Sequence, residues 1–173
     1  SGDCSGNGSV TLNLGDIKAC TITNNDRAPS LTLVKTVTND NGGSASTSAW
    51  TLTADGPTDI SGAGGATSGA SFDAGTYALS ESTGPSGYAA GGWICVGGTQ
   101  NGASITVNLG ETATCTINND DIAPQLAVIK HVINDDGGVL GAGNFTMNVT
   151  GTNVSDDSFP GSETGITVSL NAG

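Results

Sequence analysis

The sequence repeats itself at a fixed offset. Cys20-Thr-Ile-Thr-Asn24 returns as Cys115-Thr-Ile-Asn-Asn119, and Leu31-Thr-Leu-Val-Lys35 returns as Leu126-Ala-Val-Ile-Lys130, so each pair of segments is 95 positions apart (115 − 20 and 126 − 31). A period of this length matches a small folded domain, and tandem arrays of such units are built to span distance. The repeat predicts one complete unit at 28–121, preceded by the end of another unit at 1–27 and followed by the beginning of a third at 122–173.

The composition favours β-structure in every unit. Glycine contributes 28 of the 173 residues, Thr and Ser are abundant, and no run of helix formers interrupts them. Such a chain forms short strands joined by turns. We therefore expect an all-β fold.

The charge excludes several classes of partner. Sixteen acidic residues face four basic ones, which gives a net charge of −12. Nucleic acids and anionic membranes are bound through Lys and Arg, so neither is an expected partner. The sequence also has no apolar run long enough to span a membrane and no signal peptide, so we expect no membrane insertion in this segment.

The four cysteines occupy equivalent places in two units. Cys95 and Cys115 belong to the complete unit, and Cys4 and Cys20 are their counterparts in the preceding one. No further Cys or His has metal-ligand spacing around them, so two disulfides within units are expected instead of a zinc site. Each disulfide should join the last two strands of its unit, and stable disulfides indicate an extracytoplasmic compartment.

Three polar residues fall on the apolar faces of predicted strands. Strict alternation places Lys35 with Leu31 and Leu33, Glu81 with Tyr77 and Leu79, and Asn119 with Cys115 and Ile117. Burying these groups separately would cost several kcal/mol each, so we expect them to lie together.

Such a cluster has its own chemistry. Burial favours the neutral amine and the neutral acid, and a neutral amine is a nucleophile. Lys35 can then attack the Asn119 amide, with Glu81 as the catalytic proton shuttle, to form an isopeptide bond between the first and last strands. Lys130 and Asn24 are the equivalent half-sites. The alternative is a buried Lys35–Glu81 salt bridge with Asn119 hydrogen-bonded beside it.

Two further motifs resemble a known family. Tyr77-Ala-Leu-Ser-Glu81, followed by Gly84-Pro-Ser-Gly-Tyr88, is similar to the signature of Cna B-type domains, the prealbumin-like (transthyretin-like) repeats of microbial surface adhesins and pilins. The resemblance implies immunoglobulin-like β-sandwich units. It also implies a self-formed crosslink, with Lys35, Glu81 and Asn119 as lysine, catalytic glutamate and asparagine. Unlike members that rely on isopeptides, this unit also carries a cysteine pair.

Acidic, glycine-rich turns follow the first strand of each unit. Asn39-Asp-Asn-Gly-Gly43 and Asn134-Asp-Asp-Gly-Gly138 predict hairpins. Their carboxylates, together with those at the unit junctions, are candidate Ca²⁺ ligands: Asp40, Asp120, Asp121, Asp135 and Asp136. No other cofactor is expected. The glycine-rich stretch at 61–70 is predicted to be a flexible loop.

These observations predict a structural protein and not an enzyme. We expect a segment of an extracellular fibre, stalk or pilus-like filament that supports adhesion at a microbial cell surface. Its partners would be neighbouring repeats, other copies of itself and an unidentified surface ligand. One alternative is a strand-exchanging pilin whose terminal half-domains complete each other between subunits. Another is a carbohydrate- or ligand-binding module that uses Trp50 and Trp93.

Overall fold

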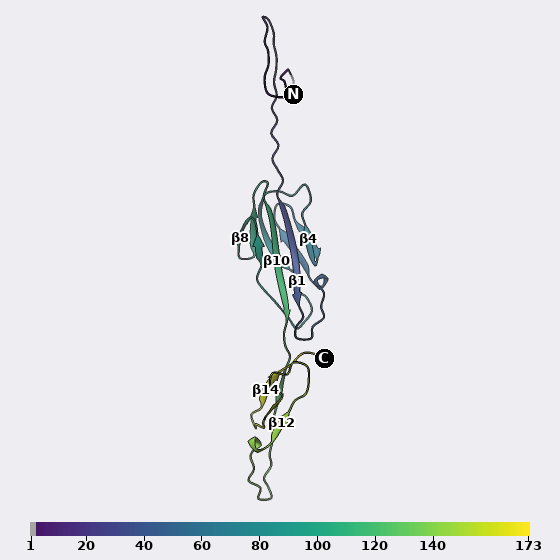
Figure 1. The fold of residues 1–173 in the computed structure, drawn as a ribbon, viewed down its shortest axis with the longest axis vertical. Helices are drawn as coiled ribbons and strands as arrows, with labels where there is room; N and C mark the ends of the chain where they lie inside the picture. The colour runs from purple at the N-terminus through teal and green to yellow at the C-terminus, as the bar shows by residue number, and fades with distance from the viewer. Residues whose placement is uncertain (1–2) are drawn as a thin grey trace.

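The computed structural model describes residues 3–173. Figure 1 shows a central body of β-strands, an extended N-terminal arm at one end, and a smaller β-rich segment that continues from the other end. The N-terminal arm is residues 3–27, the central body is residues 28–121, and the C-terminal segment is residues 122–173. Within the described residues, no helix is long and apolar enough to span a membrane.

Short strands make up nearly all of the regular structure, with two 3₁₀ turns, η1 (Thr47–Ala49) and η2 (Ala142–Asn144). The strands of the central body are β1 (Ser30–Thr38), β2 (Thr51–Asp55), β3 (Ile60–Ala63), β4 (Gly65–Thr67), β5 (Gly75–Glu81), β6 (Tyr88–Ala90), β7 (Ile94–Val96), β8 (Thr99–Asn101), β9 (Ser104–Val107) and β10 (Thr112–Asp121). The C-terminal segment contains β11 (Gln125–Val128), β12 (Thr146–Asn148), β13 (Ser158–Pro160) and β14 (Ile166–Ser169).

Two sheets face each other in the central body. One has the order β4-β1-β10-β6, with β7 also paired to β10, and the other has the order β3-β2-β5-β9-β8. The first and last strands, β1 and β10, run side by side and parallel, in a register from Ser30↔Thr112 to Thr38↔Asp120. Every other pair is antiparallel. The ends of the unit are therefore joined in one sheet.

The core lies between the two sheets and is built from alternate residues of each strand, as the period-2 pattern predicts. Its buried members are Leu31, Leu33, Leu52, Ala54, Phe72, Tyr77, Leu79, Ile105, Val107, Ala113, Cys115 and Ile117. Phe72 and Tyr77 stack with ring centroids 4.6 Å apart. The Tyr77 hydroxyl donates a hydrogen bond to the Asp73 carbonyl at 2.6 Å, so its one polar atom is satisfied.

The predicted hairpin after β1 is wrong. Residues 39–43 do form a turn, but β2 pairs with β3 and β5, in the sheet opposite β1. The connection passes through η1 and carries the chain from one sheet to the other. Glycine and asparagine indicate that the backbone turns, but they do not say which sheet it enters next.

The glycine-rich stretch at 61–70 is not simply a loop. It contains most of β3 and all of β4, which belong to different sheets. Gly64, between these strands, and Gly65, the first residue of β4, have φ of +75° and +149°, values that L side chains rarely adopt. The two glycines permit the chain to pass abruptly from one sheet to the other. As a result, β3 is the edge strand of one sheet and β4 is the edge strand of the other.

The strand predicted to begin the third unit is shorter than expected. The alternation extends from Leu126 to Val132, but β11 ends at Val128. In the central body β1 lies between β10 and β4, whereas β11 pairs with β14 alone. In the described part of the chain, no strand lies beside residues 129–132 to continue the ladder.

Candidate crosslinking site

Lys35 projects from β1 into the core, as the alternation predicts. It is only 3 % exposed. Its Nζ lies 3.0 Å from the Glu81 Oε2, and this ion pair is its one polar contact among the described residues. A buried ammonium with a single charged partner depends strongly on that partner.

Glu81 reaches Lys35 from the facing sheet. It is the last residue of β5 and pairs with Leu52 of β2, so its side chain crosses the space between the sheets. The side chain is 13 % exposed. The site therefore joins the two layers of the sandwich.

Asn119 completes the group from β10. It is 2 % exposed, and no described residue donates a hydrogen bond to its Oδ1. In the parallel register Lys35 lies opposite Ile117 and Asn119 lies opposite Val37. Lys35 and Asn119 therefore lie on the same face of adjacent strands, with Asn119 two positions further along the register than Lys35.

Trp50 closes this group on a further side, and the sequence did not reveal its role. The ring is 2 % exposed, its centroid lies 5.0 Å from the Lys35 Nζ, and it packs edge-on against Tyr88 at 5.3 Å. A Cβ on Gly84 would fall 1.9 Å from the indole Nε1, so only glycine fits there. The sequence signal for this position of Trp50 was the Gly84–Tyr88 motif, because Gly84 leaves room for the indole and Tyr88 packs against it.

The arrangement places an amine, an acid and an amide in an environment that excludes water. The Trp50 ring face stabilises a cation next to it, and Glu81 can accept or donate a proton. The Asn119 side-chain carbonyl oxygen accepts no hydrogen bond from a described residue. An amine, an acid and an amide are the groups that isopeptide formation requires. The same geometry also accommodates the alternative, a Lys35–Glu81 ion pair beside Asn119.

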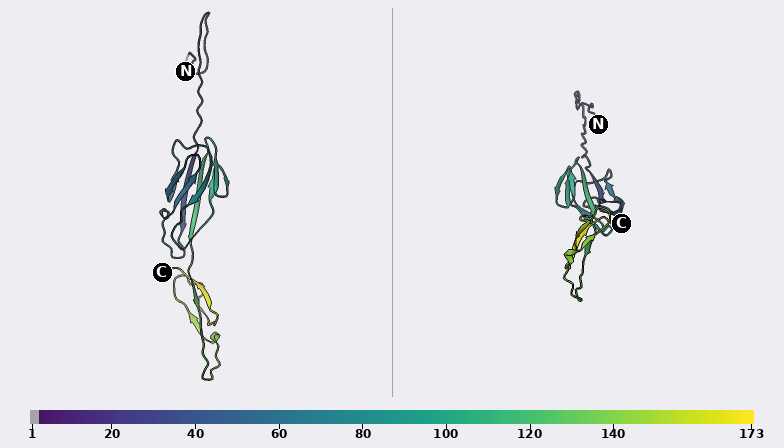
Figure 2. Two further views of the ribbon diagram at one scale, coloured as in Figure 1. Left: turned by 180° about the vertical axis from the view of Figure 1, so that it is seen from behind. Right: turned by 60° about the horizontal axis from the view of Figure 1, so that its bottom comes forward.

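The half-sites are not brought together within one chain. Lys130 lies in the C-terminal segment with its Nζ 4.6 Å from the centroid of Phe145, the counterpart of Trp50. Asn24 is exposed in the N-terminal arm. The segments that carry them lie at opposite ends of the molecule in both views of Figure 2.

Both predicted disulfides are present, Cys4–Cys20 and Cys95–Cys115. The expectation that they join the last two strands is wrong, because Cys95 lies on β7 and pairs directly with Cys115 on β10. The β8–β9 hairpin intervenes in the sequence but belongs to the opposite sheet. The disulfide attaches β7 to the buried strand that also carries Asn119.

Asp121 ends β10 and organises the turn after β1. Its carboxylate accepts hydrogen bonds from the backbone N–H groups of Gly43 at 2.6 Å, and of Asp40 and Asn41 at 3.0 Å. Burial alone would raise the pKa of Asp121, but the hydrogen bonds from Gly43, Asn41 and Asp40 outweigh it and hold the pKa below 3.8. Asp121 therefore anchors the turn as a carboxylate.

The hydrogen bonds to the Asp121 carboxylate predict that the turn at 39–43 changes its structure at low pH. Because folding lowers the pKa of Asp121, its stabilisation is complete above the pKa of an unfolded aspartate and is lost as the pH falls through the lower folded value. We expect the Gly43 amide proton, followed by NMR, to lose its hydrogen-bonded shift only at a pH below the range in which an unfolded aspartate titrates. In Asp121→Asn the shift should already be altered at neutral pH. A Gly43 signal unchanged through this acid range would contradict the anchor.

The carboxylates proposed as calcium ligands lie in two places. Oxygens of Asp40, Asp120 and Asp121 come within 4.8 Å of one another, whereas Asp135 and Asp136 lie on the separate turn of the C-terminal segment. The N–H groups of the turn already satisfy the Asp121 carboxylate. Calcium binding stays an untested prediction.

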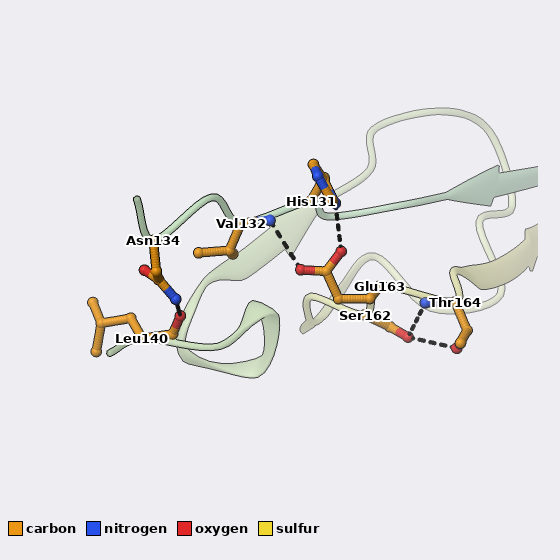
Figure 3. Close-up of polar contacts among 7 residues, drawn as sticks. All are labelled: His131, Val132, Asn134, Leu140, Ser162, Glu163 and Thr164. Atoms are coloured by element: carbon orange, nitrogen blue, oxygen red, sulfur yellow. Dashed lines mark hydrogen bonds and ion pairs between the residues drawn. The ribbon is translucent and has the colours of Figure 1, made fainter. Parts of the chain in front are cut away.

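His131, the one histidine of the chain, belongs to a structural contact. Figure 3 shows Glu163 bridging the His131 ring at 2.7 Å and the Val132 N–H at 2.9 Å. The His131 and Val132 hydrogen bonds hold the pKa of Glu163 below its usual 4.5. They attach the chain after β11 to the loop before β14. Of the two tryptophans named as candidates for ligand binding, Trp50 is buried and Trp93 packs partly buried against the core.

The fold and the paired strands define a class of surface-protein domain. The sequence profile described as a prealbumin-like fold domain, of the SpaA type, matches residues 26–117, more than half of the chain. The chain belongs to this family, a structural pilin-type fold that is not typically enzymatic. Comparison with curated proteins and with solved structures gave no significant match.

Proposed function

We propose that this chain is a load-bearing segment of an extracellular fibre or stalk at a microbial surface, and that a Lys35–Asn119 isopeptide bond strengthens it. The observation that carries the proposal is the buried group of Lys35, Glu81 and Asn119 at the junction of β1 and β10. These two strands are also the ones that continue out of the central body at its ends. Tension along the array would pass directly through them.

The crosslinking step balances without a cofactor. The Lys35 Nζ, once neutral, attacks the carbonyl carbon of the Asn119 side chain while Glu81 protonates the amide. The new C–N bond forms, the old C–N bond breaks, and one ammonia leaves. Glu81 returns to its starting state, so the chain acts on itself once and is no enzyme in the usual sense.

Intact mass tests this proposal. We expect the purified chain, fully reduced, to be lighter than its sequence mass by one ammonia, because reduction opens the disulfides but not an amide. Glu81→Ala should restore the full mass, whereas Asp55→Ala, which removes an exposed carboxylate from β2, should keep the deficit. A wild-type mass that reduction returns to the full sequence value would leave Lys35 as an ion-pair partner only.

A further inference from the structure

Two neighbouring strands of the central body lie at sheet edges. Among the described residues β7 pairs with β10 alone, and β8 is the last strand of the facing sheet, at one side of the central body in Figure 1. The short turn at Gly97 and Gly98 joins β7 to β8, so the two edges lie on the same side of the sandwich. An edge strand presents unpaired N–H and C=O groups to a possible further strand.

The register shows which backbone groups of β7 face this free edge. Cys95 lies directly opposite Cys115, and their Cα atoms are 4.0 Å apart. In antiparallel sheets the closer pairs, with Cα atoms roughly 4.5 Å apart, exchange no hydrogen bonds with each other. The N–H and C=O of Cys95 therefore point away from β10. The backbone groups of Trp93, two residues earlier, point the same way.

The Gln100 side chain occupies this edge. Its Oε1 accepts a hydrogen bond from the Cys95 N–H at 2.8 Å. Its Nε2 donates to the carbonyls of Trp93 at 2.7 Å and Gly102 at 2.9 Å, so both donors and the acceptor of the amide are used. In a parallel ladder, one residue of the adjacent strand likewise bonds the carbonyl before a residue and the N–H after it. The Gln100 amide thus takes the place of a strand beside Ile94.

Gln100 reaches β7 from the other sheet. It belongs to β8 and pairs with Ile105 of β9, which is fully buried. Residues opposite each other in a sheet point to the same face, so the Gln100 side chain points toward the space between the sheets. It therefore links the two sheet edges at the side where no strand connects them.

The edge that Gln100 covers has little other protection. Ile94 and Val96 are 70 % and 76 % exposed, and no charged residue occurs from Ser82 to Gly110. Natural edge strands are protected by charged side chains, by proline or by being short, and β7, with three residues, has only its shortness. An apolar, uncharged strand with a free edge is a site for pairing with another chain.

We propose that Gln100 caps the edge of β7, and that this cap prevents the segment 93–96 of one copy from pairing with the same segment of a second copy. The inference goes beyond the proposed role as a fibre segment and does not depend on the Lys35–Asn119 crosslink. The Cys95–Cys115 disulfide attaches β7 to β10 whether or not the cap is present, so removing the cap exposes an ordered edge.

Amide hydrogen exchange tests the cap itself. In Gln100→Ala the Cys95 N–H loses its acceptor, so we expect it to exchange at least about tenfold faster than in the wild type. Gln100→Met keeps the length of the side chain but cannot donate a hydrogen bond, and should give the same result. Gln125→Ala replaces the other glutamine, an exposed residue of β11, and should leave the Cys95 rate unchanged.

Sedimentation velocity tests what the cap prevents. We expect Gln100→Ala and Gln100→Met to associate more than the wild type at the same concentration. Adding Ile94→Glu to either variant places a charge on the exposed face of β7 and should return association to the wild-type level. Adding Ser80→Glu instead places the same charge on an exposed residue of β5, in the facing sheet, and should leave the extra association intact.

The outcomes separate a cap from a purely structural link between the sheets. An unchanged Cys95 exchange rate in both Gln100 variants would overturn the cap. Faster exchange without any added association would show that the Gln100 amide stabilises the sandwich but prevents no pairing, and would also overturn the inference. Association that persists with Ile94→Glu, or that Ser80→Glu removes equally well, would assign it to another surface.

Discussion

Replacing Glu81 by alanine is expected to lower the free energy of unfolding by about 3–5 kcal/mol, even where no crosslink can form. The measurement is made in an Asn119→Ala background, which removes the amide that Lys35 would attack. In that background Glu81→Ala leaves the Lys35 ammonium, 3 % exposed, without the carboxylate that lies 3.0 Å from it. Chemical denaturation followed by tryptophan fluorescence reports the change, since Trp50 packs on this site.

Two variants show whether the loss comes from the unpaired charge. Asp55→Ala removes an exposed carboxylate from neighbouring β2 and should change stability by no more than about 0.5 kcal/mol. Replacing both members of the pair, Lys35→Met with Glu81→Leu, should recover most of the loss because no charge is then buried. A double variant as unstable as Glu81→Ala alone would attribute the effect to packing instead.

Removing the central disulfide is expected to have the second-largest effect. Cys95→Ala with Cys115→Ala should lower the free energy of unfolding by about 3 kcal/mol, because the disulfide closes a loop with a sequence separation of 20. It should also detach β7, whose only strand partner within residues 3–173 is β10. Thermal and chemical denaturation of the central body measure the change.

The second disulfide is the natural control. Cys4 and Cys20 lie in the N-terminal arm, outside the two sheets, so Cys4→Ala with Cys20→Ala should leave the unfolding midpoint of the central body unchanged. Equal losses for the two pairs would show that the arm and the central body unfold as one unit. That outcome would contradict the explanation that the Cys95–Cys115 disulfide stabilises the central body by attaching β7 to β10.

Much of the site could be predicted from the sequence, because side chains along a strand point alternately to its two faces. The period of two assigns Lys35, Glu81 and Asn119 to the side of their apolar neighbours without knowledge of strand order. The resemblance to Cna B-type domains then placed them in one family pattern, and the family profile confirms the prealbumin-like domain over residues 26–117. The burial of Lys35 and Asn119 and the Lys35–Glu81 contact confirm the inward orientation.

Other parts of the site were not accessible in this way. Trp50 precedes β2 in phase with the buried Leu52 and Ala54, which indicates that it faces the core but not that its ring covers the Lys35 amine. Asp121 was considered as a calcium ligand, and its role as the acceptor for three backbone N–H groups of a distant turn became visible only in the fold. Both roles depend on contacts between residues far apart in the sequence, which local pattern does not encode.

The sequence by itself determined the β-structure, the facing of the strands and the cysteine pairs, and it predicts a repeat of 95 residues. Each of these follows from local spacing, because side-chain direction along a strand depends only on residue number. The tertiary structure decided which sheet each strand joins, that β1 and β10 lie parallel, and that the turn at 39–43 is held by Asp121 of β10 and by Ala172 of the C-terminal segment. These features arise because backbone groups must find partners across the whole chain, and many strand orders satisfy the same alternation.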